Sequence, residues 1–208
     1  RHADGQEEEV GRVRHRRLRE IRFRRDRTSL PGMEVLFLEW VLLQNPRRRF
    51  PSGKHSMPGQ KHPGLGVLRD VMAWLVVLCG ELGLDGLMFM PAGYFVATFG
   101  SRFLDPAHQA RLEAMRRALS SVRLVEATRV VEERRLVNAA TGAAVPWEPA
   151  PMVIPVSARL RERVEGPAYE AALETELAML SYRLREPGEL EPPSGADRAT
   201  GQRPERKP

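Results

Sequence analysis

A nearly uninterrupted apolar segment, residues 33–43 (MEVLFLEWVLL), constrains the fold more than any other part of this sequence. It is rich in Val, Leu, Phe and Trp, and turn-forming Pro-Gly and Asn-Pro pairs bound it on its two sides. Short apolar runs between turn residues are typical of strands that are buried on both faces of a sheet. The segment therefore predicts a central strand, in which Glu34 and Glu39 are the only charged residues.

A buried helix and a second buried strand are predicted directly after this strand. Apolar residues recur at helical spacing over residues 64–82, with Val71, Leu75 and Leu78 on one face. The short apolar run at residues 87–90 (LMFM) then has the length and composition of a buried strand.

The rest of the chain also mixes helical and strand patterns. Residues 19–25 alternate partly between apolar and basic side chains, which is typical of an edge strand with one wet face. Further on, we expect a helix over residues 94–103, a helix capped by Asp105 and Pro106, strands over 122–131, 134–137, 143–147 and 152–156, and a helix over 169–185, with the middle two strands forming a hairpin. Together these elements predict one α/β (mixed α+β) domain with a central sheet flanked by helices.

Composition divides the 208 residues into three parts. Nine arginines lie between Arg12 and Arg27, and large apolar residues are few there, so we expect residues 1–18 to be a basic flexible segment. Residues 19–185 contain the apolar patterns and are expected to form the domain. Residues 186–208 are rich in Pro, Gly and charge, which is typical of a disordered tail.

Cysteine content and hydropathy limit the protein class. A single cysteine, Cys79, excludes an internal disulfide framework and a cysteine-cluster metal site, and we expect no metal. The longest apolar run is too short to span a bilayer, and the N-terminal residues show no signal-peptide pattern. We therefore expect a cytoplasmic protein without a membrane partner.

The loop before the predicted helix is the most suggestive segment chemically. Residues 59–66 (GQKHPGLG) lead from the predicted strand into the helix, where backbone N–H groups point outward and the helix dipole is positive. Gly64 and Gly66 remove the side chains that would keep an anion from the backbone, and Lys61 and His62 add charge or donors. These features predict a phosphate or pyrophosphate site. The alternative is a Pro-Gly turn whose glycines serve tight packing.

The order strand, K-x-x-G-x-G loop, apolar helix and strand resembles the acetyl-CoA-binding half of the GNAT superfamily of N-acetyltransferases. The family has Gln or Arg where Lys61 stands, and the resemblance covers residues 33–104. It implies acetyl-CoA as cosubstrate and a predicted strand that pairs with the pantetheine of the coenzyme. It also implies that the loop holds the pyrophosphate through Lys61, His62, Gly64, Leu65, Gly66 and Val67.

Two residues are candidates for catalysis. A carboxylate within an apolar strand has a raised pKa if it is desolvated, which would suit Glu39 as a general base; the alternative is an arginine partner or a strand end open to solvent. Tyr94 is the best remaining hydroxyl for an acid or a substrate contact, although a tyrosine at a helix start usually packs. The tyrosine that commonly protonates the leaving thiolate in the family would fall near Phe99 or Gly100, where no hydroxyl is present.

The family also places a strand, two helices and two further strands before the pantetheine strand, more than the first thirty residues can supply.

Two function classes therefore follow. The first is direct transfer of an acetyl group from acetyl-CoA to an amine, whose identity the sequence does not reveal. The second is a non-catalytic scaffold of the same fold, which binds an acidic partner or nucleic acid through its arginine-rich segments, residues 12–27 and 47–49. Few aromatic residues accompany these arginines, which does not favour nucleic acid.

Overall fold

A computed structural model describes residues 11–15, 19–45, 47–50, 56, 60–98, 101–186 and 189, of which residues 11–15, 19 and 20 are described by their backbone only. The elements in chain order are β1 (Gly11–His15), β2 (Arg19–Asp26), β3 (Val35–Leu43), α1 (Leu68–Glu81), β4 (Gly86–Phe89), α2 (Tyr94–Ala97), β5 (Arg102–Phe103), α3 (Pro106–Ala118), α4 (Leu124–Glu132), β6 (Leu136–Asn138), β7 (Met152–Pro155), α5 (Ala158–Glu165), α6 (Pro167–Ala178) and β8 (Tyr182–Leu184).

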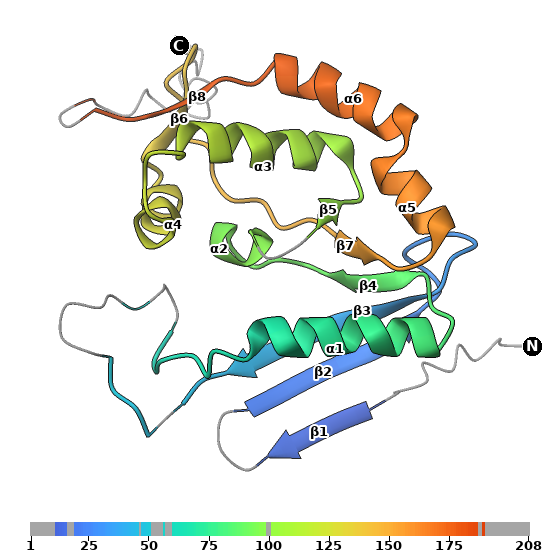
Figure 1. Ribbon diagram of the computed structural model, residues 1–208. Helices are drawn as coiled ribbons and strands as arrows, with labels where there is room; N and C mark the ends of the chain where they lie inside the picture. The colour runs from blue at the N-terminus through green and yellow to red at the C-terminus, as the bar shows by residue number, and fades with distance from the viewer. Residues whose placement is uncertain are drawn as a thin grey trace, which may run out of the picture.

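The central sheet has six strands in the order β1-β2-β3-β4-β7-β5 (Figure 1). The strands β1, β2 and β3 pair antiparallel, β3 and β4 pair parallel, and β7 pairs antiparallel with both β4 and β5. Helix α1 makes the crossover that a parallel pair requires. A second sheet contains β6 and β8 only. The chain thus forms the mixed α/β domain with flanking helices that the sequence predicts.

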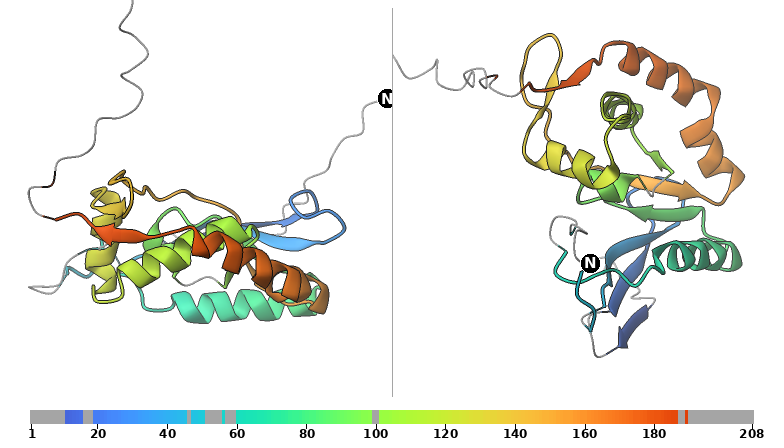
Figure 2. Two further views of the ribbon diagram at one scale, coloured as in Figure 1. Left: turned by 90° about the horizontal axis from the view of Figure 1, so that it is seen from above. Right: turned by 60° about the vertical axis from the view of Figure 1, so that its left-hand side comes forward.

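Alternate residues of the central strands enter two hydrophobic clusters, because successive side chains of a strand point to opposite faces. The first cluster contains Leu36, Leu38, Leu87 and Phe89 with Leu75 and Cys79 of α1. The second contains Val35, Met88 and Val153 with Leu160, Val164 and Leu173 of α5 and α6. In the right-hand view of Figure 2 the central strands accordingly lie between α1 and the helices α3, α5 and α6.

Several expectations are confirmed. The strand predicted over residues 33–43 is β3, the helix over 64–82 is α1, and the strand over 87–90 is β4, whose four residues are all buried. Asp105 is the N-cap of α3 and its side chain accepts a hydrogen bond from Ala107 N. One detail of the prediction for β3 was wrong: the buried residues lie in its first half, whereas Glu39 and Trp40 are exposed and the last three residues are half-buried.

The N-terminal strands differ from the expectation. Residues 19–25 do form a strand, but β2 pairs on both sides, with β1 and with β3, and is therefore not an edge strand. Strand β1 lies within residues 1–18, so five residues of that segment belong to the sheet rather than to a flexible arm. Residues 1–10 and 16–18, and the tail beyond 186 apart from Glu189, lie outside the described residues.

Residues 122–131 were expected to be a strand and are in fact helix α4. Val and Thr indicated a strand, but the buried residues Ala127, Val130 and Val131 recur at helical spacing.

Three further boundaries changed. Residues 94–103 contain the short α2 and then β5. Helix α6 ends at Ala178, and the residues after it form β8, which pairs with β6. The hairpin expected over residues 134–147 is present, since Asn138 N donates to Ala143 O and Val145 N donates to Leu136 O, each at 2.9 Å, but its second side forms only a bridge between Ala144 and Val137 and not a named strand.

Candidate functional site

Strand β3 continues beyond the strand that pairs with it. The parallel pairing of β3 with β4 covers Val35 to Leu38 only, whereas pairing with β2 continues to Leu43. Within the part of the chain that the structure describes, no strand pairs with residues 39–42 on the side away from β2. Since the backbone of a strand carries donors and acceptors on both sides, this stretch can bind a further extended chain.

A β-bulge begins this unpaired stretch. Phe23 pairs with Leu38 and Arg22 pairs with Trp40, so Glu39 is an extra residue in β3. A bulge bends the strand and redirects its backbone groups, and bulges are common beside active sites. Glu39 thus lies at the position where the pairing with β4 stops.

The loop before α1, which was predicted to bind an anion, is hydrogen-bonded to the end of β3. Leu65 N donates to Leu43 O at 2.9 Å, and Asn45 N donates to Pro63 O at 2.7 Å. Gln44 and Gly64 form an isolated antiparallel bridge. The chain therefore returns along β3 before α1 begins, which places the loop directly beside the end of the strand, as Figure 1 shows.

The start of α1 is open. Its N-cap is Val67, and no side chain caps the helix. The backbone N–H groups of the first turn can therefore donate hydrogen bonds to solvent or to an anion.

Gly66, immediately before the N-cap, has φ +79°, and a Cβ added there meets no atom within 4 Å. A Cβ at Gly64 makes only ordinary contact, at 3.6 Å from Gln60 Nε2. The positive φ explains why residue 66 is glycine, whereas tight packing explains neither Gly64 nor Gly66.

The six residues predicted to hold a pyrophosphate come together in this loop. Lys61, Gly64, Gly66 and Val67 are exposed, while His62 and Leu65 are half-buried. The sequence could place these residues because they are consecutive. It could not show that the loop is hydrogen-bonded to β3.

Glu39 is not the desolvated carboxylate that a raised pKa requires. Its side chain is 43% exposed, and Arg24 Nε lies 3.2 Å from Glu39 Oε1. Arg24 also lies over the ring of Phe37, 5.0 Å from its centroid, and 3.2 Å from Asp26. The alternative expectation, an arginine partner from the N-terminal part of the chain, is the one that the structure supports.

Tyr94 is buried at the start of α2. Its ring meets Trp147 edge-on, with 6.3 Å between centroids and 77° between planes. Burial raises the pKa of the Tyr94 phenol, with Arg116 opposing the shift, so the phenol stays protonated. Trp147, which the sequence did not single out, donates from Nε1 to Pro91 O at 2.9 Å and fixes the chain before α2. Phe99 and Gly100 lie outside the described residues.

The opposite end of β4 carries an anchor that sequence reasoning missed. The buried carboxylate of Asp85 accepts hydrogen bonds from Glu34 N at 2.8 Å and from Ser157 Oγ at 2.6 Å, and both Nε and Nη2 of Arg159 bind it. The contact with Arg159, more than any other, lowers the pKa of Asp85 to about 2. The one sequence feature that could have indicated the role of Asp85 is its position as a single acid between apolar residues. The partners, more than fifty or seventy residues away, were not predictable.

These contacts predict an acid-labile fold. Burial raises the pKa of Asp26, but hydrogen bonds from Ser29 and Thr28 outweigh it and lower the pKa to about 2, as for Asp85. Since both folded-state pKa values lie below the unfolded value, each carboxylate stabilises the protein above that value, by roughly 2 kcal/mol. We expect this stability to be lost as the pH falls from about 5 to about 2. Urea unfolding at several pH values measures it, and a flat profile would contradict the assignment.

Other chemistry finds little support in the described residues. The Cys79 thiol is buried, and burial raises its pKa to about 11, so it is not a thiolate nucleophile. A pocket lined by Phe103, His108 and Trp147 has room for only about one water molecule. No group of three or more His, Cys, Asp or Glu that could hold a metal occurs among the described side chains. None of the described helices has the length and apolarity to cross a bilayer.

Comparison with known proteins does not assign the chain to a family. No family model, no curated protein and no solved structure matches it.

Proposed function

We propose that this protein is an acyl-CoA-dependent N-acyltransferase that binds acetyl-CoA between the end of β3 and the loop before α1. The observation that carries the proposal is the juxtaposition of two features. Residues 39–42 of β3 have one side without a pairing strand among the described residues, and the loop that leads to the uncapped start of α1 is hydrogen-bonded to the end of the same strand. The first suits an extended amide chain, and the second suits an anion.

These features match the two parts of the coenzyme. Pantetheine is an extended chain with two amide groups, which can pair with the backbone of β3 as an added strand would. The pyrophosphate then falls at the loop, where amides near Gly66 and the charge of Lys61 receive it. The resemblance to the GNAT superfamily assigns the same parts to the same segments. The order β1-β2-β3 followed by α1 and β4 also supplies two of the three strands that the family pattern places before the pantetheine strand.

The reaction is the direct attack of an amine on the thioester. The neutral amine nitrogen forms a bond to the carbonyl carbon, the carbon–sulfur bond breaks, and the coenzyme leaves as a thiolate. Backbone N–H groups at the bulge polarise the carbonyl, in the manner of an oxyanion hole. Glu39 is paired with Arg24, so solvent water takes the proton that the amine loses, and the protonated phenol of Tyr94 is the candidate donor to the thiolate. Acetyl-CoA chemistry and a reduced Cys79 fit a cytoplasmic setting, which is part of the proposal.

Calorimetric titration with coenzyme A tests the proposal. We expect the wild type to bind, and Gly66→Ala to bind about tenfold more weakly, a loss of about 1.4 kcal/mol, because the added methyl group enters the place of the phosphate. Gly83→Ala is the matched control. Gly83 stands at the other end of α1 with φ +65° and also has no atom within 4 Å of an added Cβ. It therefore carries the same backbone strain, and its coenzyme affinity should be unchanged.

The outcomes separate binding from stability. If both glycine variants lose thermal stability but only Gly66→Ala loses affinity, the loop contacts the ligand. If the wild type shows neither heat nor a thermal shift at millimolar coenzyme A, the acyltransferase proposal is wrong.

The scaffold alternative depends on unpaired arginines. Within β2 and just after it, the charges are largely matched, since Arg24 pairs with Asp26 and Glu39, and Arg25 and Arg27 both pair with Glu34. This matching leaves little free charge there for an acidic partner or nucleic acid. Binding of a single-stranded oligonucleotide without binding of coenzyme A would support the alternative.

A further inference from the structure

A run of exposed arginines, Arg47, Arg48 and Arg49, follows β3 directly. A turn fixes where the run begins: Arg47 N donates to Asn45 Oδ1 and Arg48 N donates to Asn45 O, each at 3.1 Å. Asn45 is also the residue whose amide binds Pro63 O. The arginine run therefore starts two residues from a direct contact with the loop that precedes α1.

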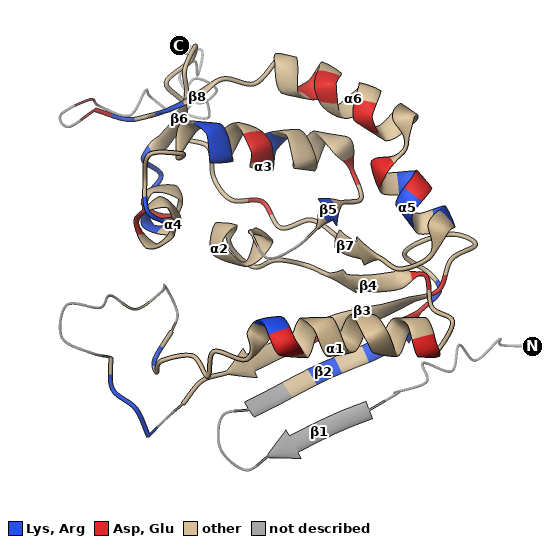
Figure 3. Ribbon diagram, viewed as in Figure 1, with Lys and Arg blue, Asp and Glu red and all other residues tan. Residues whose placement is uncertain are grey.

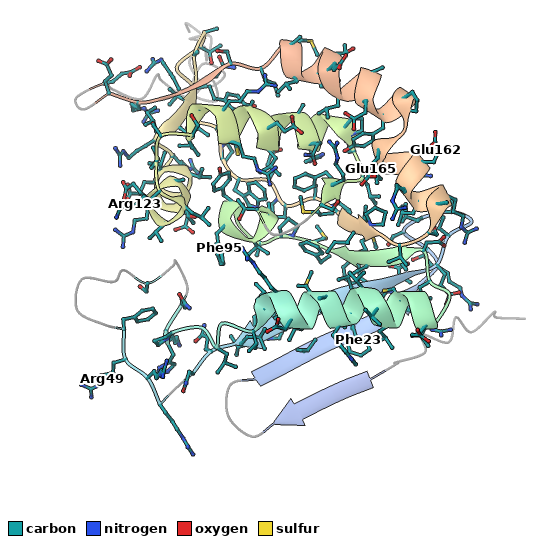
Figure 4. All side chains as sticks on the ribbon, in the orientation of Figure 1. Phe23, Arg49, Phe95, Arg123, Glu162 and Glu165 are labelled. Carbon is teal, nitrogen blue, oxygen red and sulfur yellow. The ribbon has the colours of Figure 1, made fainter. Side chains whose placement is uncertain are left out.

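The run differs from the arginines of β2 in its charge environment. Residues 44–63 contain no acid at all. Among the described side chains, no ion pair joins a carboxylate to Arg47, Arg48 or Arg49, whereas Arg24, Arg25 and Arg27 all have such partners. Figure 3 shows these residues as a continuous blue segment of the connection between β3 and α1. In Figure 4 Arg49 lies at the far side of the molecule from Glu162 and Glu165 of α5.

We propose that this arginine run binds the 3′-phosphate of coenzyme A, so that the protein distinguishes coenzyme A from its 3′-dephospho form. The inference rests on the proposed function. Coenzyme A carries its pyrophosphate and its ribose 3′-phosphate as separate anionic groups. A pyrophosphate held in the loop would have the arginine run beside it, because Asn45, which is hydrogen-bonded to Pro63, lies two residues before Arg47. Guanidinium groups bind phosphate through paired N–H donors. An exposed arginine without an ion-pair partner can do so without first breaking a contact with a carboxylate.

Calorimetric titrations with coenzyme A and with 3′-dephospho-coenzyme A test the inference. We expect the wild type to bind coenzyme A about tenfold more tightly than the dephospho form, and Arg48→Gln/Arg49→Gln to bind the two ligands within about twofold of each other. Affinity for the dephospho form should change little. The matched control is Arg117→Gln/Arg163→Gln, which removes the same charge from exposed positions on α3 and α5 and should keep the tenfold preference.

Each outcome decides between the two proposals. Equal affinity of the wild type for both ligands overturns the assignment of the 3′-phosphate and leaves the acyltransferase proposal intact. A preference lost equally in the control and in the arginine-run variant also overturns it, because net charge then explains the effect. Failure of the wild type to bind either ligand at millimolar concentration overturns both proposals.

Discussion

Replacing Asp85 with Ala is expected to lower the free energy of unfolding by about 3 kcal/mol, because two half-buried donors lose their acceptor and a buried side chain is truncated. Glu34 N and Ser157 Oγ donate to this carboxylate, and Asp85 itself is only 2% exposed. Neither donor gains a replacement when the side chain ends at Cβ. Arg159 is less affected, since its side chain is 58% exposed and water can solvate it. Urea unfolding at neutral pH measures the change.

A conservative change elsewhere provides the control for Asp85. Asp105→Asn alters an exposed acid that caps α3, and Asn caps a helix as well as Asp, so this variant should stay within about 0.5 kcal/mol of the wild type. A loss below about 1 kcal/mol in Asp85→Ala would contradict the role of Asp85 as the anchor between β3, β4 and α5.

Replacing Leu75 with Ala is expected to cost about 2–5 kcal/mol, because the side chain is removed from a close-packed site. Leu75 is fully buried and lies in the cluster under α1 with Leu36, Leu38 and Leu87. The truncation leaves a cavity that the sheet can fill only in part. Thermal and urea unfolding should both show the loss.

Val77→Ala is the control on the same helix. Its side chain is 62% exposed, so the change should alter stability by no more than about 0.5 kcal/mol. If Leu75→Ala and Val77→Ala have equal effects, the packing of α1 on the sheet is misassigned.

Elements with a strong local pattern could be predicted from the sequence. The apolar run of β3, the helical spacing of α1 and the Asp-Pro start of α3 depend on residues close in the chain, and each was placed within a few residues. The loop residues of the candidate site could be named for the same reason. The backbone conformation of this loop explains why residue 66 is glycine, because glycine adopts φ +79° without strain.

The contacts that were missed all join distant parts of the chain. The pairing of β6 with β8 adds a strand beside the local hairpin, and no property of residues 134–147 indicates a partner at 182–184. The pairing of β3 with β4 ends at Leu38, just before Glu39, which the composition of β3 does not reveal. An arginine from the N-terminal part of the chain was anticipated as a partner of Glu39, but its identity, Arg24, depends on the pairing of β2 with β3.

The position of β7 determines when the sheet can be completed. Strand β7 lies between β4 and β5, although residues 104–151 separate it from β5 in the chain. On the ribosome, β4 has only one neighbour until β7 has been synthesised, and its other edge remains open. The sheet therefore closes late, through pairings between residues that are far apart, and such pairings form slowly. During that interval the open edge of β4 is a place where the nascent chain can pair with another chain.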